Sequence, residues 1–420
     1  MKKKIAAVGF LAIVLVGQNA FAKSLEDVLK EKGVITEEDY KEVTKSKPID
    51  YKLGKGFTFT TADEKFQLTL GGRMQFRYTF TDFDINTSTK SDTSQWDAKR
   101  IRFIAQGYAY SKDLTYKLET DLRAYASDTK KGLVEAQMSY KLIDEVQFKL
   151  GQYKTPFCRQ ELTSDGTLQF VDRSPVVDAF KHGYDIGAML NGKIANGLAY
   201  YYTGVFGGAG QTSTRSTNDN MFVARAVVNP LGDMAYSEAD LDGSTKPLLS
   251  IGANYFMNTL NKTGGSLDNT ISNFAASSGW LGKGFKKTGY AATNDKLDVE
   301  SYGADLAFKW MGLSLQGEYL LGQAESQRTI TKNLLRAQGF YAQAGYMIIP
   351  KTLEVAFRYS YLDPDRDVAN DLITEQIGAV SYYFNKHNLK LQADVGNIHT
   401  QTSTTPTDDM QYRVQAQIIF

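Results

Sequence analysis

One stretch of the chain, residues 66–80, constrains the fold more than any other. Apolar side chains from Phe66 to Phe80 alternate with polar or charged ones such as Arg73 and Arg77. A period of two residues predicts a β-strand with one apolar and one polar face. The run is longer than the roughly 5–6 residues of an ordinary strand, and it reaches the roughly 9–11 residues that cross a bilayer at a tilt. It therefore predicts a membrane-crossing strand.

The same alternation recurs at residues 114–123, 134–141, 353–361 and 389–395. Charged side chains occupy one face of each strand, which predicts a wet interior, because burying so many ions in a packed core is costly. After residue 22, no stretch approaches the roughly 20 apolar residues that a membrane helix needs. A chain that crosses a bilayer with strands must close into a barrel, since every backbone polar group then has a partner.

The pattern predicts an all-β fold, a 16-stranded antiparallel transmembrane β-barrel over residues 61–420 that contacts outer-membrane lipid. The expected strands are 66–82, 96–110, 114–125, 133–141, 146–154, 184–194, 198–206, 220–229, 248–257, 298–309, 311–321, 337–348, 353–362, 373–384, 389–398 and 410–420. An even strand number, with tight turns alternating with longer loops, is typical of bacterial outer-membrane barrels. Residues 230–247 break this alternation, either as an extended periplasmic turn or as an irregular strand.

The two ends of the chain indicate export to the cell outer membrane of a Gram-negative bacterium. Three lysines, an apolar stretch and Ala20-Phe21-Ala22 predict that residues 1–22 are a signal peptide, cut before Lys23. Residues 23–60 are expected to be a short periplasmic helical or linker segment, with helix within 24–45, and its role is left open between a coiled-coil stub and a plug-like piece. The last strand ends in Phe420 and resembles the signal that the barrel assembly machinery recognises.

Composition excludes several classes of function. The 48 basic and 47 acidic residues are balanced, so no nucleic acid is expected as a partner. A lone cysteine, Cys158, can form no internal disulfide. The three histidines lie in no recognisable triad motif, so an outer-membrane hydrolase is the weakest of the functions considered. The sequence predicts no enzyme, no cofactor and no metal site.

Several ordered motifs resemble the phosphate-selective porin O and P family. They are Gly151-Gln152-Tyr153-Lys154-Thr155-Pro156-Phe157, Asp172-Arg173-Ser174, Tyr184-Asp185-Ile186-Gly187, Arg225 to Pro230, Tyr359 to Asp367 and Gly33 to Tyr40. The resemblance implies a homotrimer of 16-stranded barrels whose third outer loop folds into the lumen as a constriction. Residues 155–183 occupy that loop's position after the fifth strand. Tyr184 stands where the family has arginine, and so phosphate selectivity does not carry over directly.

Two groups of residues are the candidate sites. The pore-lining candidates are Arg73, Arg77, Arg100, Arg102, Glu119, Asp121, Arg123, Arg225 and Arg358. The constriction-loop candidates are Lys154, Arg159, Glu161, Asp172, Arg173 and Lys181, with Asp165 and Asp178 in the same loop. The arginines either form a basic patch that favours anions or pair with nearby acids as a wall network. Asp172-Arg173-Ser174 is expected to anchor the loop.

The function expected from these features is a porin, a water-filled outer-membrane channel for passive diffusion of small hydrophilic solutes. Anions such as phosphate are candidate solutes, although inward-facing acids nearly balance the bases. The alternative is a structural or partner-binding barrel, such as a sheath or an adhesion platform, with a plugged lumen. The loop 258–297, rich in Gly, Ser, Asn and Lys, is a candidate surface contact under either function.

Overall fold

The structure is a computed structural model of the full chain that divides into two compact units, residues 1–48 and 49–420. It describes residues 29–38, 49–84, 91–127, 132–215, 218–263, 266–267, 279–283, 294–327 and 334–420. In the first unit, residues 29–31 and 37–38 are helical. Residues 32–35 between them are turns and bends, and the predicted signal peptide and residues 24–28 and 39–45 of the predicted helix lie outside the described residues. No helix in the described ranges is long and apolar enough to cross a membrane.

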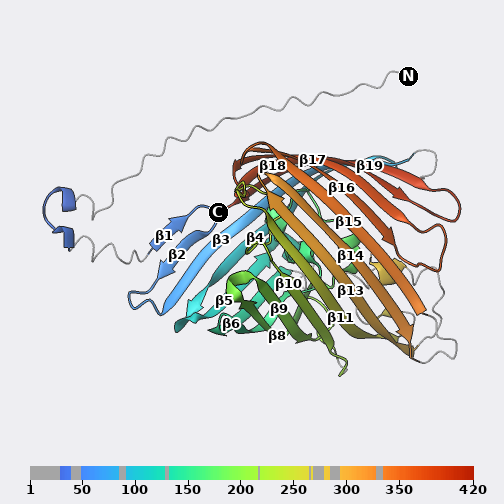
Figure 1. Ribbon diagram of the computed structural model, residues 1–420, viewed down its shortest axis with the longest axis horizontal. Helices are drawn as coiled ribbons and strands as arrows, with labels where there is room; N and C mark the ends of the chain where they lie inside the picture. The colour runs from blue at the N-terminus through green and yellow to red at the C-terminus, as the bar shows by residue number, and fades with distance from the viewer. Residues whose placement is uncertain are drawn as a thin grey trace, which may run out of the picture. The chain divides into compact units, whose positions relative to one another are not determined.

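The second unit is a closed antiparallel barrel of 16 strands (Figure 1). The barrel strands are β3 (Phe66–Asp82), β4 (Thr93–Ala109), β5 (Ser111–Asp121), β6 (Leu133–Ile143), β7 (Val146–Lys154), β8 (Tyr184–Ile194), β9 (Ala199–Phe206), β10 (Met221–Val228), β11 (Leu248–Thr263), β13 (Asn294–Trp310), β14 (Leu313–Ser326), β15 (Leu334–Ile349), β16 (Leu353–Asp363), β17 (Ile373–Asn385), β18 (Leu389–Thr400) and β19 (Thr407–Ile419). Each pairs with the next, and β19 pairs with β3 to close the ring. Every predicted strand is present.

Within the described ranges, three further strands lie outside the ring. The hairpin of β1 (Ile49–Lys52) and β2 (Gly56–Thr60) pairs with β3 at Gln67–Leu70. The hairpin and β19 thus occupy the same edge of β3, because β19 pairs further along that strand, with Arg73–Asp82. The helical or linker prediction for 23–60 was therefore wrong for these two strands, which lengthen the barrel wall. The short strand β12 (Ser266–Leu267) pairs with the end of β11.

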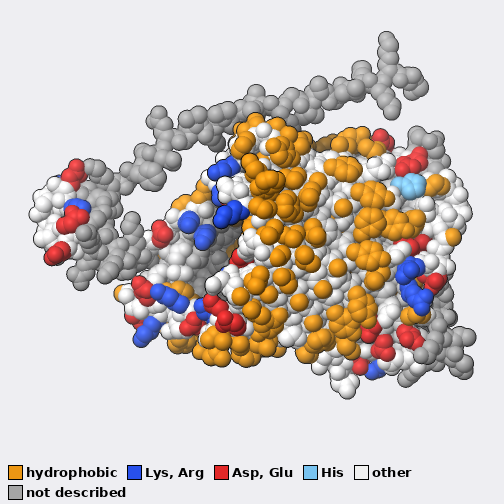
Figure 2. All heavy atoms as spheres, viewed as in Figure 1, with side chains coloured by type: hydrophobic (Ala, Val, Ile, Leu, Met, Phe, Trp, Pro, Cys, Tyr) orange, Lys and Arg blue, Asp and Glu red, His pale blue; other side chains and the backbone are white. Residues whose placement is uncertain are grey.

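The barrel presents apolar side chains outward, as Figure 2 shows over a broad band of its face. Among the exposed large side chains are Phe103, Leu150, Leu306, Phe357 and Val395, which alternate with inward-pointing neighbours. The connections β4–β5, β6–β7, β13–β14, β15–β16 and β17–β18 are short turns at one end, which is the periplasmic end in barrels of this kind. One expected strand was too long at its C-terminal end, because residues Leu122–Ser127 form helix α3 instead.

Candidate permeation path and constriction loop

The long connection between β7 and β8, residues 155–183, lies inside the barrel. It contains α5 (Arg159–Leu162), the 3-10 turn η1 (Asp165–Thr167) and α6 (Pro175–Phe180). The Ser164 and Ser174 side chains accept hydrogen bonds from the Gly166 and Val176 backbone N–H groups, and these bonds start η1 and α6. Most residues of the loop are buried. The segment folds inward, and we call it the constriction loop.

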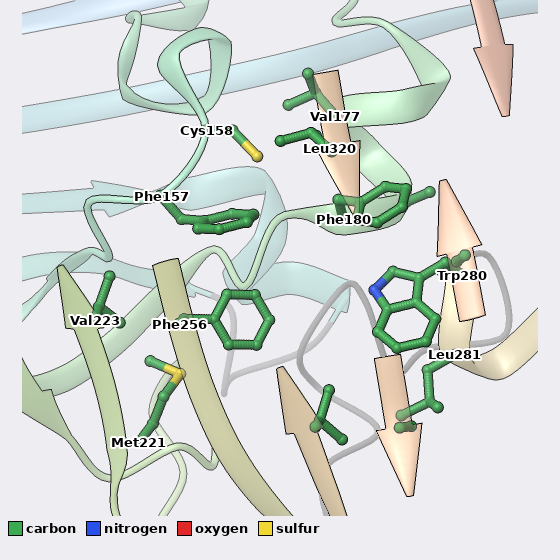
Figure 3. Packing of buried hydrophobic residues seen from close by; sticks show 14 of the residues in the cluster. Phe157, Cys158, Val177, Phe180, Met221, Val223, Phe256, Trp280, Leu281 and Leu320 are labelled. Carbon is green, nitrogen blue, oxygen red and sulfur yellow. The ribbon is translucent and has the colours of Figure 1, made fainter. Parts of the chain in front are cut away.

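One side of the constriction loop is apolar and packs against the barrel wall (Figure 3). Phe157 meets Phe256 of β11 edge to face, with ring centroids 4.8 Å apart. Phe180 of α6 stacks on Trp280 at 5.9 Å. Inward-pointing apolar residues of β10 to β16 complete the cluster, including Met221, Val223, Leu260, Leu297, Val299, Leu320, Leu335 and Leu362. The expectation of a wet interior was therefore wrong for this side of the lumen, which holds a dry core.

Glycines mark where this packing brings the chain close to the wall. A Cβ on Gly339 of β15 would lie 2.8 Å from Val176 Cγ1. One on Gly322 of β14 would lie 2.7 Å from the Trp280 ring. Both positions face inward in the strand alternation, so the absent side chains make room for α6 and Trp280.

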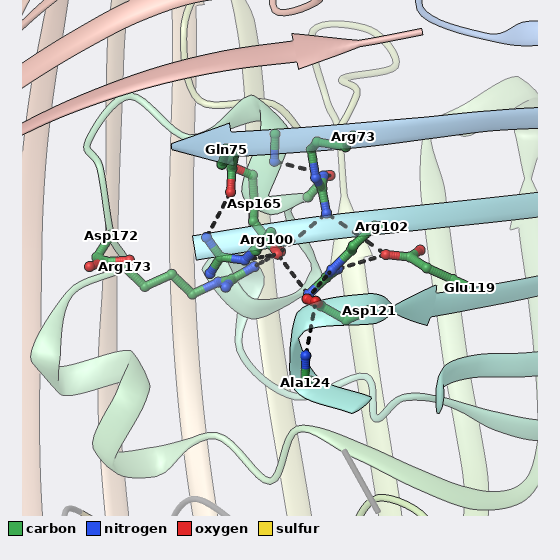
Figure 4. A network of polar contacts seen from close by, with 12 residues as sticks. Arg73, Gln75, Arg100, Arg102, Glu119, Asp121, Ala124, Asp165, Asp172 and Arg173 are labelled. Atoms are coloured by element: carbon green, nitrogen blue, oxygen red, sulfur yellow. Dashed lines mark hydrogen bonds and ion pairs between the residues drawn. The ribbon is translucent and has the colours of Figure 1, made fainter. Parts of the chain in front are cut away.

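The opposite side of the constriction loop is held by charge, and Asp165 is the centre of that contact (Figure 4). Its carboxylate lies 2.7 Å from Arg100 Nε, 3.1 Å from Arg102 and 3.4 Å from Arg73. Arg173 and Lys154 approach it from the loop side at 3.1 and 3.9 Å. A single anion thus joins three arginines of β3 and β4 to the constriction loop.

The acids at this contact are held ionised by their neighbours. Burial alone would raise the pKa of the Asp165 carboxyl, but Arg102, Arg100 and Arg73 hold it well below its usual range. Burial likewise opposes ionisation of Glu161, yet Arg173, Lys181 and Lys154 lower its pKa to about 2. The carboxylates that anchor the constriction loop therefore stay ionised at every pH well above 2.

A second set of contacts fixes the middle of the loop. Asp172 pairs with Arg77 of β3 at 2.6 Å and with Arg413 of β19 at 3.3 Å. The Arg358 guanidinium of β16 donates to the backbone carbonyls of Asp172 and Arg173 and pairs with Glu375 at 2.9 Å. The Ser174 and Ser360 hydroxyls lie 3.0 Å apart. These are the contacts of an anchor, the role expected for Asp172-Arg173-Ser174.

The start of the loop is fixed to β10–β14 in the same way. The Glu318 carboxylate accepts hydrogen bonds from the backbone N–H groups of Arg159 and Gln160, each at 2.7 Å. Asp305 lies 2.7 Å from the Arg225 guanidinium and 3.6 Å from that of Arg159. Arg225 also donates to the Phe157 carbonyl at 3.1 Å. Both guanidinium groups are fully enclosed, so they serve the packing of the loop.

Two cavities lie on the side of the lumen that the loop leaves uncovered. The upper one, of about 170 Å³, is lined by side chains of β4, of the constriction loop and of the segment that follows β9. Its lining residues are Arg100, Arg102, Glu161, Asp165, Arg173, Lys181, His182, Gly183, Tyr184 and Gln211. We call it the eyelet. It contains four cationic and two anionic side chains, an excess of two positive charges.

The lower cavity, which we call the vestibule, has a volume of about 650 Å³ and lies toward the periplasmic end. It follows the eyelet along β4, where Gln106 and Tyr108 succeed Arg102. Its charged lining consists of Lys52 and Asp50 of β1, Lys55, Lys117 and Lys149. The remaining lining is amide, hydroxyl and phenol groups of β2–β8. Four lysines face one aspartate, an excess of three positive charges.

These positions sort the predicted pore-lining residues into three groups. Arg100 and Arg102 line the eyelet. Buried ion pairs or hydrogen bonds to the loop or wall hold Arg73, Arg77, Glu119, Asp121, Arg225 and Arg358. Arg123 belongs to neither group, because it lies in α3 with its side chain half exposed and pairs with Asp97 at 2.8 Å. A strand was predicted there because the alternation of the sequence continues to Arg123, whereas β5 ends at Asp121.

Sequence reasoning missed two inward segments and most of the vestibule. Residues 230–247 form no strand but turn into the lumen, and Trp280 of the predicted surface loop is completely buried. The burial of Trp280 could have been suspected from the sequence, because a large aromatic residue is unusual in a Gly- and Ser-rich surface loop. Lys52 and Lys55 were overlooked because their hairpin was interpreted as part of a linker.

Comparisons with known proteins agree with this architecture. The family model described as Phosphate-selective porin O and P matches residues 68–420. The chain belongs to this family. It is 24% identical to Porin O of Pseudomonas aeruginosa over 86% of this chain and 81% of that protein. The chain is therefore a porin of the outer membrane of a Gram-negative bacterium.

Solved outer-membrane structures share the fold. The channel DcaP of Acinetobacter baumannii superposes with a TM-score of 0.56 at 13% identity, over 87% of this chain and 100% of that one. The in-vitro folded trimer form of OmpT of Vibrio cholerae gives 0.50 at 12% identity, over 84% and 99%. At this level of identity the likeness concerns the barrel alone.

Proposed function

We propose that this porin is a passive channel that favours small hydrophilic anions. The observation that carries the proposal is the charge along the uncovered side of the lumen. The eyelet has two excess positive charges and the vestibule has three. A charged wall around a narrow aqueous passage favours ions of the opposite sign. Phosphate, the anion in the family's name, is one solute that we propose.

Within the vestibule, a lysine without a nearby carboxylate contributes more to this field than a lysine that a carboxylate neutralises. Lys117 is compensated by Glu119 at 2.8 Å and by Glu135 at 2.6 Å. Lys149 has no carboxylate within salt-bridge distance in the described part of the chain, and its ammonium lies 5.2 Å from the Tyr153 ring centre. A unit charge about 6 Å from an ion in water is worth about 0.7 kcal/mol, which is about a threefold change in ion occupancy.

Lys149→Ala tests this preference. We expect the ratio of chloride to potassium permeability to fall by up to about tenfold, because the lost charge acts on the two ions in opposite directions, and to appear as a shift of the zero-current potential in a planar bilayer under a KCl gradient. Lys112→Ala is the matched control, since Lys112 is exposed at the start of β5 and pairs with Glu64. An equal shift in both variants, or none in Lys149→Ala, would reject the vestibule as the origin of selectivity.

The competing function is a structural or partner-binding barrel with a closed lumen. The buried constriction loop favours it, whereas the eyelet and vestibule oppose it. Stepwise single-channel currents from purified protein would support the porin. Added phosphate that lowers the chloride current would support phosphate as a solute. A heat-modifiable, folded barrel that gives no current steps would support the structural function.

We also propose three properties that the chain needs in order to reach and work in the outer membrane. Residues 1–22 are removed as a signal peptide, Phe420 ends the strand that the barrel assembly machinery recognises, and the barrel is a homotrimer, as the trimer form of OmpT suggests by analogy. We propose no enzymatic activity. Mass spectrometry of the mature N-terminus and SDS gels without boiling would test the first and third properties. A band at monomer size before and after boiling would count against the trimer.

A further inference from the structure

The connection between β10 and β11, residues 230–247, is long for the periplasmic end and does not stay in solvent. Met234, Glu238, Ala239, Asp240 and Leu241 are all at most 5% exposed. A surface turn would expose such residues, above all the two acids. We call this stretch the periplasmic segment.

The periplasmic segment crosses beneath one side of the lumen. Ser237 accepts a hydrogen bond from Lys309 of β13 at 2.6 Å, and the Asp240 carboxylate accepts one from the Gly312 N–H at 2.8 Å. Ala239 and Leu241 pack with Met347 of β15 and Tyr383 of β17. Its contacts therefore extend from β10, where it begins, to β17.

The same segment holds the constriction loop from below. The Glu238 carboxylate accepts hydrogen bonds from the Gln169 backbone N–H at 2.7 Å and from Gln160 Nε2 at 2.8 Å. The Arg159 guanidinium lies over the Tyr236 ring, 4.9 Å from its centre. A buried donor or acceptor without a partner lowers the free energy of unfolding, so these hydrogen bonds make the periplasmic segment and the constriction loop stabilise each other.

Inward side chains of this wall, which contact the constriction loop or the periplasmic segment, have almost no solvent-exposed surface to offer a solute. Ser314, Gln316, Glu354 and Lys390 are each at most 6% exposed. On the other side of the lumen, Gln106 and Thr115 are exposed and Ser139 and Lys149 are partly exposed. The eyelet and the vestibule both lie on that second side.

We propose that the periplasmic segment is a second constriction element, which together with the constriction loop closes the β11–β17 side of the lumen and confines permeation to the β3–β8 side. Glu238 is its positioning residue, because it joins the periplasmic segment to the constriction loop. The proposal rests on the proposed channel function. The proposal adds that ion selectivity depends on keeping solutes away from the closed wall, whose inward side chains include both acids and bases.

Accessibility of single cysteines tests the closure in the intact fold. Ser314→Cys would place a thiol against Gln169 of the constriction loop, which Glu238 of the periplasmic segment holds, and Ser139→Cys would place one in the vestibule. Cys158, the chain's own cysteine, is completely buried and should stay silent. Labelling of the detergent-purified protein with an anionic methanethiosulfonate is followed by mass spectrometry, and the current of each variant is compared before and after labelling.

We expect rapid labelling and loss of current for Ser139→Cys, and neither for Ser314→Cys. Equal labelling rates would overturn the proposed closure, even if the protein conducts. Absence of current in every preparation would instead contradict the channel function, while the labelling rates would still report on the closure.

Replacing residues 234–241 with a Gly-Ser segment of equal length tests the consequence for transport. We expect Ser314→Cys to become reactive in this background, conductance to rise by about twofold and anion preference to fall. The same replacement of residues 401–406, an exposed connection between β18 and β19, is the matched control. Unchanged conductance, selectivity and Ser314→Cys reactivity in a heat-modifiable barrel would overturn the proposal.

If the replacement prevents folding, Glu238→Ala provides the milder variant. It removes the acceptor for Gln169 and Gln160 but keeps the length of the segment. We expect a measurable rise in the labelling rate of Ser314→Cys, and an unchanged rate would contradict the positioning role of Glu238.

Discussion

Two walls of the same barrel have opposite interiors. Along β10–β16, inward residues such as Phe256 and Leu320 are fully buried against the constriction loop. Along β4–β8, inward residues such as Gln106 and Lys149 keep contact with solvent. In both walls, outward and inward side chains alternate with a two-residue period, and the outward side chains are apolar. Strand periodicity therefore identifies the lipid-facing side, whereas the connections that fold inward decide which part of the inner face is wet.

Breaking the charged contact of the constriction loop should have the largest effect on this difference. Asp165→Ala would leave Arg73, Arg100 and Arg102 close together without their shared anion. Removing one partner of a buried ion pair costs about 3–5 kcal/mol. We expect the loop to loosen, with larger and noisier single-channel currents. Asp178→Ala is the control, because that carboxylate in the same loop is half exposed.

Currents of wild-type size and noise from Asp165→Ala would show that the apolar contacts alone hold the constriction loop, and the two sides would then contribute unequally to its anchoring.

The dry side is tested by Phe180→Ala. The substitution empties a space against Trp280, and loss of a buried Phe costs about 3–5 kcal/mol. We expect faster trypsin cleavage at the basic residues of the constriction loop in detergent, since loosening exposes them. Trp96→Ala, at a side chain that is 76% exposed, should leave cleavage unchanged. Equal cleavage of both variants and wild type would contradict the dry core.

A smaller effect is expected from overpacking the dry side. Gly339→Ala would place a Cβ 2.8 Å from Val176 and should cost about 1–3 kcal/mol. Gly378→Ala is the matched control, since no atom lies within 4 Å of its added Cβ. The midpoint temperature of heat-modified migration on SDS gels should fall for the first variant only. A lower midpoint temperature in both variants would show that the added methyl group destabilises the strands themselves and not the contact with α6.

The smallest effect is expected from pH. The folded-state pKa values of Asp165 and Glu161 are depressed, so their stabilisation is complete above the unfolded carboxyl pKa of about 4 and is lost as pH falls toward 2. Channel conductance should therefore stay constant from pH 7 to pH 5. A step in conductance within that range would show that the loop anchors titrate near neutrality and that another group controls the loop.

The sequence predicted the barrel well because strand alternation is local. All sixteen strands were expected, several with the observed bounds, such as Val146–Lys154 and Tyr184–Ile194. The inward position of the constriction loop came from its place in the strand order and from the family resemblance. The helix at Leu122–Ser127 was missed because its first residues still alternate.

The contents of the lumen were not predictable in the same way. Which arginine binds a loop acid depends on contacts between residues far apart in sequence, such as Arg100 with Asp165 and Arg358 with the Asp172 carbonyl. A count of inward acids and bases gave near balance. The local excess of positive charge became visible only when the side chains that line the eyelet and the vestibule were counted apart from the rest of the inner face.

The zero-current potential of the wild-type protein in a planar bilayer under a KCl gradient tests the anion preference most directly. Chloride that permeates more readily than potassium leaves the concentrated side positive, which is the predicted result. A potential near zero, or a negative concentrated side, would contradict a permeation path lined by the arginines and lysines of β1–β8.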